Sequence, residues 1–330
     1  MYSIADDLPA SVSIEPVTEA DWDAWRNQTL NDFGRYVYGV TPEFDFQVHR
    51  ELIEQQPAHG GTRSRYAVTI TGPLGSHTVE LLVILPDSVD RARVFLGLNF
   101  GGNAEAEEKW PISDILERGY GVATIAAADL EPDRLDGAPE GVRRVLGEID
   151  RTWGTLGVWA WGLSVMRSQL AELDRVRSDQ IVVIGHSRMG KAAIWAGAQD
   201  DQFAAVISNN AGCGGDSLLG HHAGEDIAAI TKSMYFWFTP TYAEYAGRDH
   251  ELPVDQHQLI ACVSPRPAYV GSASNDDWAD PVGQFLAVMA ARQIQQDRSP
   301  IGFHLRPGKH DLVWEDWQHY ITFLDTHLPA

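Results

Sequence analysis

The stretch that decides the fold is Ile181-Val182-Val183-Ile184-Gly185-His186-Ser187-Arg188-Met189-Gly190-Lys191. Four β-branched apolar residues lead into a turn that contains glycine, and the helix-forming run 191–198 follows at once. A buried strand, a sharp turn and a helix in this order are typical of a nucleophile elbow, whose strained turn lifts a serine hydroxyl above the edge of a sheet. The first N–H groups of such a helix point at whatever the serine attacks.

The match to the usual Gly-x-Ser-x-Gly pattern is imperfect. Met189 stands where the second glycine belongs, and Gly190 follows one place late. The alternative is therefore an ordinary strand-to-helix turn of a doubly wound sheet, where turns with glycine are common.

Strands and helices alternate on both sides of this turn. Two β-rich runs, 65–71 and 78–85, flank Gly72-Pro73-Leu74-Gly75 and predict an antiparallel hairpin. Further strands are expected at 94–99, 121–127, 181–184, 203–208, 267–273 and 301–305, and helices at 105–118, 153–173, 191–199, 281–296 and 314–327. This pattern predicts a mostly parallel central sheet with helices on both faces. Eight strands in this order are the layout of the α/β-hydrolase fold.

The chain divides into an extension and one large domain. Residues 1–64 lack a sustained pattern, and we expect an N-terminal extension that packs on the main domain. Residues 65–330 are expected to form the α/β-hydrolase domain, since no linker or internal repeat divides them. The segment 215–264 is the largest insertion between predicted strands, and we interpret it as a cap over the site.

Charge and hydropathy narrow the class of partner. The chain has 46 acidic and 25 basic residues, and its formal net charge of −21 argues against nucleic acid and anionic membranes. No run reaches the ~18 apolar residues that span a bilayer. The acidic start, residues 1–23, shows no signal peptide, which suggests the cytoplasm, although a chain without its leader would look the same. We expect a monomer that meets its substrate in a specific pocket.

Cysteine and histidine usage predicts neither a disulfide framework nor a metal site. Cys213 and Cys262 are expected to be buried thiols, and a single bridge between them is the alternative. His221 and His222 are adjacent and do not share a face, and no further ligand shows the spacing of a zinc site. We therefore expect no metal and no other cofactor.

Polar residues follow the last two predicted strands, where a serine nucleophile needs its partners. Ligands of such sheets bind at the carboxyl ends of the strands, and the chain order in this fold is serine, acid, histidine. His310 lies in the loop after the final strand, where the base belongs. In the loop 273–281, Asp276 is the first choice of acid because it comes earliest, and Asp277 is the second. Asp280 precedes a proline and is typical of a helix N-cap.

Two other histidines are expected to be structural. His186 adjoins the serine, but neighbouring side chains on a strand point apart, so we expect it to pack, with Asp311 as its neighbour, rather than to act as the base. His304 lies within the last predicted strand and is expected to be packed there.

Five segments carry a family resemblance. They are Gly-His-Ser-Arg-Met-Gly-Lys at 185–191, Asn-Asn-Ala-Gly-Cys-Gly-Gly at 209–215, Ser-Pro-Arg-Pro at 264–267, Trp-Ala-Asp-Pro at 278–281 and Arg-Pro-Gly-Lys-His-Asp at 306–311. From about residue 90 onward the chain resembles the glucuronoyl esterases of carbohydrate esterase family 15, in which the late glycine of the elbow is normal. The resemblance implies cleavage of the ester between glucuronic or 4-O-methylglucuronic acid on xylan and lignin alcohols. The partner would be a small or polymeric uronate ester, and members are usually secreted.

The resemblance assigns roles at the elbow. It implies Ser187 as the nucleophile, His310 as the base and Arg188 as part of the oxyanion hole. A permanent cation directly after the serine is well placed to stabilise a developing oxyanion. The alternative is a surface arginine in a salt bridge, although a helix N-terminus is a poor place for a cation without an anion nearby.

The resemblance also implies residues that bind the sugar. Lys191 and Trp278 match residues that hold sugar hydroxyls, and Glu225 matches a further hydroxyl-binding position more loosely. Lys191 lies one helical turn after Ser187 and faces the same direction, so two cations near the helix start suit a uronate. The alternative is a solvated lysine.

Asn210 is the one clear departure from the family. Many members carry the triad acid at this position, after the strand that follows the nucleophile, and asparagine cannot supply the charge that stabilises an imidazolium. The acid must then come from the later loop, which favours Asp276. Two alternatives stay open: an acetylxylan esterase or general carboxylesterase, and an inactive carbohydrate-binding relative, which the asparagine motivates.

Overall fold

The computed structural model describes residues 8, 12, 14–147, 150, 152–221 and 223–329. His222, one of the two adjacent histidines considered above, lies outside these residues, as does most of the segment 1–13. Within the described part of the chain, no helix combines the length and the apolar character that a membrane crossing needs.

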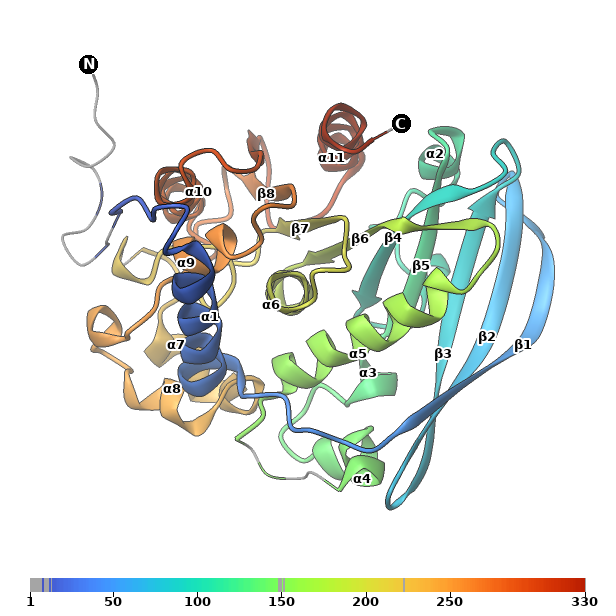
Figure 1. Ribbon diagram of the computed structural model, residues 1–330, viewed down its shortest axis with the longest axis horizontal. Coiled ribbons are helices and arrows are strands. Elements are labelled where there is room, and N and C mark those ends of the chain that lie inside the picture. Colours follow the sequence, from blue (N-terminus) through green and yellow to red (C-terminus); the bar gives the residue numbers. More distant parts are fainter. Residues whose placement is uncertain are drawn as a thin grey trace.

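One twisted sheet of nine strands organises the described residues (Figure 1). In spatial order the strands are β1 (Gln47–Ala58), β2 (Gly61–Gly72), β3 (Gly75–Pro86), β5 (Tyr120–Ala126), β4 (Ala92–Asn99), β6 (Val176–His186), β7 (Ala205–Asn209), β8 (Ala268–Ala273) and β9 (Ile301–Arg306). Strands β1, β2, β3 and β5 pair antiparallel, and the pairs from β5 through β4 to β9 are parallel. The predicted α/β-hydrolase fold, with its hairpin followed by a mostly parallel sheet, is confirmed.

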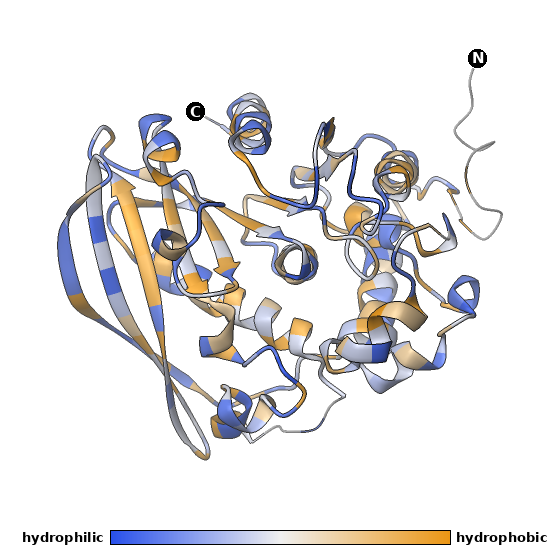
Figure 2. Cartoon of the chain, turned by 180° about the vertical axis from the view of Figure 1, so that it is seen from behind, coloured by the Kyte–Doolittle hydropathy of each residue, from blue (hydrophilic) through white to orange (hydrophobic). Residues whose placement is uncertain are grey.

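Strand β1 is the strand of the described sheet that the sequence did not predict. It pairs along its length with β2, yet its side chains are mostly exposed and many of them are polar. In Figure 2 hydrophilic residues are frequent on the outer strands, whereas hydrophobic residues gather on the strands further in. An edge strand with little buried surface lacks the alternation that identifies a strand in a sequence.

Helices cover both faces of the sheet. Their bounds are α1 (Trp22–Phe33), α2 (Ile112–Glu117), α3 (Ala127–Leu130), α4 (Arg143–Leu146), α5 (Thr155–Ala171), α6 (Arg188–Gln199), α7 (Ile227–Met234), α8 (Pro240–Glu244), α9 (Gln256–Ala261), α10 (Pro281–Gln295) and α11 (Trp314–His327). Residues of α5, α6, α9 and α10 share one hydrophobic core, and residues of α2 and α11 share the other. Val183 of β6 belongs to the first core, and Val182 and Ile184 belong to the second, because successive strand residues point to opposite faces.

The predicted helix over 105–118 is wrong in its first half. A short 3₁₀ turn, η3 (Ala104–Ala106), is followed by an irregular segment, and α2 starts only after Pro111. A proline is tolerated at the start of a helix but interrupts its interior, because it lacks the N–H donor. The loop between β4 and α2 is therefore longer than expected.

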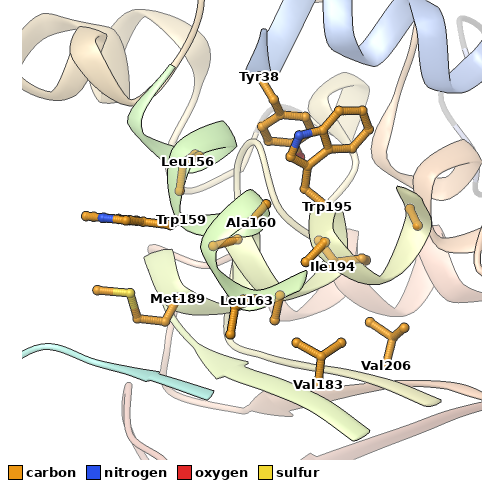
Figure 3. Packing of buried hydrophobic residues seen from close by; sticks show 14 of the residues in the cluster. Tyr38, Leu156, Trp159, Ala160, Leu163, Val183, Met189, Ile194, Trp195 and Val206 are labelled. Atoms are coloured by element: carbon orange, nitrogen blue, oxygen red, sulfur yellow. The ribbon is translucent and has the colours of Figure 1, made fainter. Parts of the chain in front are cut away.

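Helix α6 is fixed against the sheet by close packing (Figure 3). A Cβ at Gly197 would lie 2.2 Å from a methyl carbon of Val206, so only glycine lets this helix approach β7. On its far side, the Trp195 ring stacks on Tyr38 with the ring centroids 4.8 Å apart. The helix that follows Ser187 is thus held between the sheet and the N-terminal segment.

The N-terminal segment and the insertion at 215–264 pack on the sheet and its helices. Arg26 of α1 donates hydrogen bonds to the carbonyls of Ala198 and Cys262, which ties α1 to the ends of α6 and α9. The insertion at 215–264 forms short helices: α7, α8 and α9 with the 3₁₀ turns η5 (Leu219–His221), η6 (Tyr235–Trp237) and η7 (Asp249–Glu251). The domain boundary at residue 64 and the role of the insertion as a cap stay predictions.

Candidate active site

The turn at Ser187 is strained in the way an elbow requires. Ser187 lies between β6 and α6 with φ 57° and ψ −130°, a backbone conformation that L side chains rarely adopt. A Cβ at Gly185 would lie 2.0 Å from the carbonyl oxygen of Met189, and one at Gly190 would lie 3.0 Å from that of Gly185. Gly190 is therefore the second glycine of the turn, although it comes one place later than the usual pattern. The alternative of an ordinary strand-to-helix turn does not account for the strain.

The predicted base and the first-choice acid lie in contact. His310 Nδ1 is 2.6 Å from Asp276 Oδ2, and the Asp276 carboxylate is only 4% exposed, whereas the His310 side chain is 40% exposed. Asp277 is exposed to solvent. Asp280 accepts a hydrogen bond from the Gly283 N–H and caps α10, which confirms its interpretation as an N-cap. Of the three carboxylates in this loop, Asp276 is the one that meets the histidine.

His186 is a buried neighbour of His310, the predicted base. Its Nδ1 is 2.7 Å from Asn209 Oδ1, and its ring centroid is 4.7 Å from that of His310. Burial, together with the nearby charge of His310, lowers the pKa of His186 to about 3, so this imidazole stays neutral near neutral pH. The predicted structural role is confirmed, and the contact also places His310 beside the elbow.

Asp311, the expected neighbour of His186, interacts electrostatically with that imidazole. Asp311 pairs with Lys109, whose Nζ lies 2.7 Å from its Oδ1. Burial opposes ionisation, but the Lys109 ammonium and the Leu312 N–H hold the pKa of Asp311 below its ordinary value. His304 is packed, as predicted, with its Nε2 2.7 Å from the buried carboxylate of Asp316.

Asn210 lies at the end of β7 in the left-handed region, with φ 48°. Its Nδ2 donates a 3.3 Å hydrogen bond to the backbone carbonyl of Asp311. Its Oδ1 is buried without a hydrogen-bond partner among the described residues. The amide thus contacts the loop that carries His310, and it supplies no charge there.

Arg188 is held by residues that the sequence did not single out. Its Nε lies 2.6 Å from Asp133 Oδ2, and its guanidinium carbon lies 4.4 Å from the ring centroid of Phe100 and 5.7 Å from that of Trp237. Trp237 Nε1 donates to the other oxygen of Asp133 at 2.6 Å. Arg188 therefore forms a salt bridge, as the alternative interpretation of a surface arginine expected. The salt bridge lies at the elbow, where Asp133 supplies the anion that a cation at a helix N-terminus needs.

Of the three residues that contact Arg188, only Phe100 has a position in the sequence that could have identified it. Phe100 directly follows the predicted strand 94–99, so the rule that ligands bind at carboxyl ends of strands would have selected it. Asp133 lies in a long irregular connection, and Trp237 lies within the insertion. No periodicity or motif marks either position.

The three residues predicted to bind sugar lie together. Lys191 is 4% exposed, which excludes the solvated alternative, and its Nζ donates to the carbonyls of Ala211 and Cys213. Glu225 Oε2 lies 3.7 Å from the same Nζ, and Glu225 Oε1 accepts a 3.1 Å hydrogen bond from Trp278 Nε1. The Trp278 ring is 60% exposed. Whether this cluster holds sugar hydroxyls stays a prediction.

The cysteines are free thiols, as predicted. Cys213 and Cys262 are both buried and unbridged, and burial raises the pKa of each to about 12. In the described part of the chain, no three His, Cys, Asp or Glu side chains gather as a metal site would require.

Comparisons with known proteins agree on one family. A family model described as glucuronyl esterase of fungi matches residues 144–297. The carbohydrate esterase MZ0003, from an unknown prokaryotic organism, is 32% identical over 389 aligned positions that cover 99% of this chain and 90% of the relative. The solved structure of a glucuronoyl esterase from Solibacter usitatus is 30% identical, with a TM-score of 0.86, and the match covers 100% of this chain and 99% of that chain.

A more distant relative carries a more specific name. A 4-O-methyl-glucuronoyl methylesterase from the fungus Wolfiporia cocos is 27% identical over 172 positions. That match covers 49% of this chain and 42% of the fungal protein, so it concerns a part of each.

Proposed function

Because the chain belongs to the glucuronoyl esterase family, we propose that it is a serine hydrolase that cleaves glucuronoyl or 4-O-methylglucuronoyl esters between xylan and lignin alcohols. The observation that carries the proposal is the 2.6 Å contact between His310 and the buried Asp276 beside the strained turn at Ser187. A serine nucleophile needs a base whose second ring nitrogen is held by a carboxylate, and these three residues follow one another in the chain order of this fold.

In the first step, the Ser187 hydroxyl attacks the C6 carbonyl carbon of the uronate ester. His310 Nε2 takes the hydroxyl proton as the new C–O bond forms, and Asp276 holds Nδ1–H and stabilises the imidazolium. The tetrahedral intermediate collapses by breaking the bond to the alcohol oxygen, which leaves with the proton from His310. The products of this step are a free alcohol and an acyl-enzyme.

In the second step, water replaces the alcohol. His310 accepts a proton from the attacking water, and the bond between the acyl carbon and the Ser187 oxygen breaks. The proton returns to the serine, and glucuronic acid is released. His186 does not compete as a base, because its imidazole is buried and its pKa is lowered to about 3.

Arg188 supports the oxyanion in this scheme. Guanidinium has five N–H donors in a planar fork, so the contact of Nε with Asp133 leaves donors for a ligand. The aromatic rings of Phe100 and Trp237 on the guanidinium limit its freedom. An oxyanion donor that is already oriented is worth about 3–4 kcal/mol of transition-state stabilisation.

The cluster of Lys191, Glu225 and Trp278 supplies the uronate side of the site. The Lys191 ammonium donates hydrogen bonds to two backbone carbonyls and lies 3.7 Å from a Glu225 carboxylate oxygen. It therefore holds the Glu225 carboxylate in position. Glu225 can then accept from a sugar hydroxyl, and the exposed Trp278 ring offers a flat face to a pyranose.

Hydrolysis of the methyl ester of glucuronic acid tests the proposal. We expect turnover by the wild-type chain and none by Ser187→Ala. Failure to hydrolyse this ester, together with rapid deacetylation of acetylated xylan, would identify an acetylxylan esterase or general carboxylesterase instead. Failure with both substrates would favour the inactive carbohydrate-binding relative that Asn210 motivates.

A further inference from the structure

The side chain of Arg306 is buried where β9 ends and the loop that carries His310 begins. Arg306 is the last residue of β9, and it is only 3% exposed. Its Nε donates to both carboxylate oxygens of Asp316, at 3.0 and 2.8 Å, and Asp316 is itself fully buried in the first turn of α11. The guanidinium is therefore anchored to α11 by a buried ion pair, which fixes where its remaining N–H groups point.

The other end of the guanidinium is enclosed by the loop. Its Nη2 donates to the carbonyl oxygen of Lys309 at 3.2 Å and to that of Asp311 at 2.5 Å, and these are the residues directly before and after His310. Its Nη1 donates to the carbonyl oxygen of Pro307 at 3.2 Å. A single side chain thus holds the backbone on both sides of His310.

Gly308 lets the loop close around the guanidinium. Its φ is 119°, and a Cβ there would lie 2.9 Å from Arg306 Nη1, closer than a Cβ can approach without displacing the group. The same turn is tied to the loop of the predicted acid, because the Asn275 N–H donates to the Gly308 carbonyl at 2.8 Å. The turn around Arg306 therefore fixes the loops of both partners in the 2.6 Å contact between His310 and Asp276.

We infer that Arg306 is a positioning residue for the reaction, which fixes where the His310 imidazole lies relative to Asp276 and Ser187. The inference rests on the proposed function, since it presupposes that His310 is the base. The guanidinium acts through the backbone of the loop and not on the substrate. A displacement of about 1 Å in a reacting group costs on the order of 10²-fold in rate, even when its cause is remote from the chemistry.

Arg306→Lys tests the inference without removing the positive charge. A lysine has one ammonium nitrogen, so it cannot hold Asp316 and the loop carbonyls at the same time as the three nitrogens of the planar guanidinium do. We expect kcat on methyl glucuronate to fall about tenfold to 100-fold and KM to stay within about twofold, because the residues proposed to bind the sugar are unchanged.

The matched control is Arg266→Lys. Arg266 Nη1 also donates to two backbone carbonyls, those of Asp200 and Phe203, but these precede β7, at the opposite end of the strands from the site. This variant should lose stability in thermal unfolding and keep the kcat of wild type.

A double-mutant cycle separates the positioning of His310 from a general loss of structure. The His310→Ala background has no imidazole to position, so Arg306→Lys should lower kcat/KM there by less than about twofold. The 4-nitrophenyl ester of glucuronic acid keeps the residual rate measurable, because its leaving group departs without a proton. A loss as large as in the presence of His310 would mean that Arg306 supports the site by another route, and it would overturn the inference.

A second variant covers the possibility that Arg306→Lys does not fold. Gly308→Ala keeps the guanidinium but adds a Cβ that must displace it from the loop, so kcat should fall about tenfold with KM unchanged. Gly247→Ala is its control, because Gly247 also has a positive φ, of 75°, and a Cβ there meets nothing within 4 Å.

The outcomes for the inference and for the proposed function are distinct. A wild-type kcat in folded Arg306→Lys or in folded Gly308→Ala would overturn the positioning role and leave the esterase proposal intact. No turnover of either ester by wild type would refute the esterase proposal itself.

Discussion

Strands β7 and β8 end side by side at the same edge of the sheet, and each delivers a polar side chain toward the loop of His310. At the end of β7, Asn210 gives one hydrogen bond to the Asp311 carbonyl, and its oxygen has no hydrogen-bond partner in the described part of the chain. After β8, the buried Asp276 carboxylate lies 2.6 Å from the His310 ring. One position holds the backbone of the base loop, and the other holds the imidazole. The comparison predicts that the charge next to His310 comes from the end of β8 and not from the end of β7.

Removing the negative charge of Asp276, after β8, should have the largest effect on activity. Asp276→Asn leaves an amide at both positions, so the imidazolium formed during attack loses its counter-charge. We expect kcat on methyl glucuronate to fall by about 10³–10⁴-fold. Asp277→Asn is the matched control, because Asp277 is exposed, and its kcat should stay near that of wild type. Equal small losses in the two variants would show that neither residue is the acid.

Moving the charge to the end of β7 sharpens the comparison. In the double variant Asp276→Asn with Asn210→Asp, a carboxylate returns to the other strand end, where the left-handed backbone at φ 48° tolerates aspartate. We expect kcat to recover by about tenfold or more over Asp276→Asn alone, since a displaced charge still stabilises the imidazolium. If kcat stays at the level of the single variant, then the position after β7 cannot serve His310.

The pH dependence of stability offers a further test at the end of β7. Asn209, which precedes Asn210 there, is the hydrogen-bond partner of His186. The pKa of His186 is about 3 in the folded state against an ordinary 6.5, so between these values the unfolded chain binds a proton that the folded chain does not. The free energy of unfolding should therefore fall as pH falls through this window and should be unaffected above it. Urea unfolding at pH 7 and pH 5 should show His186→Gln losing less stability than wild type, by on the order of 1–2 kcal/mol.

The exposed His250 supplies the control for that measurement. His250→Gln removes a histidine at the surface and should keep the pH dependence of wild type. The same slope in His186→Gln and in wild type would mean that the buried imidazole does not resist protonation.

Removing the Asn210 side chain should have the smallest effect. Asn210→Gly loses the hydrogen bond to the Asp311 carbonyl, but glycine adopts a positive φ without strain. Asn210→Ala loses the same hydrogen bond and adds backbone strain of about 1 kcal/mol. We expect both variants to lose only severalfold in kcat, and thermal unfolding should rank Asn210→Gly above Asn210→Ala in stability. A loss as large as that of Asp276→Asn would mean that the amide, too, is essential to the base.

The elbow, the parallel strands and the contact of Asp276 with His310 could be predicted because each leaves a local mark. The run from Ile181 to Lys191 combines β-branched residues, glycines and a serine in one short segment. Asp276 is the first acidic residue after β8, so its place in the chain predicted that it would lie near His310. These features depend on neighbours in sequence or on the common edge at which parallel strands end.

The rest depends on contacts between distant segments. Asp133 meets Arg188 only because the irregular connection after β5 folds back over the elbow, and no periodicity marks it. Strand β1 is stabilised by pairing with β2 and buries few side chains, so its polar sequence does not reveal it. Lys191 could be placed on the correct helix face, but its burial among backbone carbonyls is a tertiary property.

Covalent labelling with a fluorophosphonate probe tests most directly whether Ser187, His310 and Asp276 act as one unit. We predict that wild type gains one adduct on the peptide that contains Ser187, that Asp277→Asn is labelled at the same rate, and that Asp276→Asn is labelled far more slowly. Labelling of Asp276→Asn at the wild-type rate, or no adduct on Ser187 in wild type, would contradict the account.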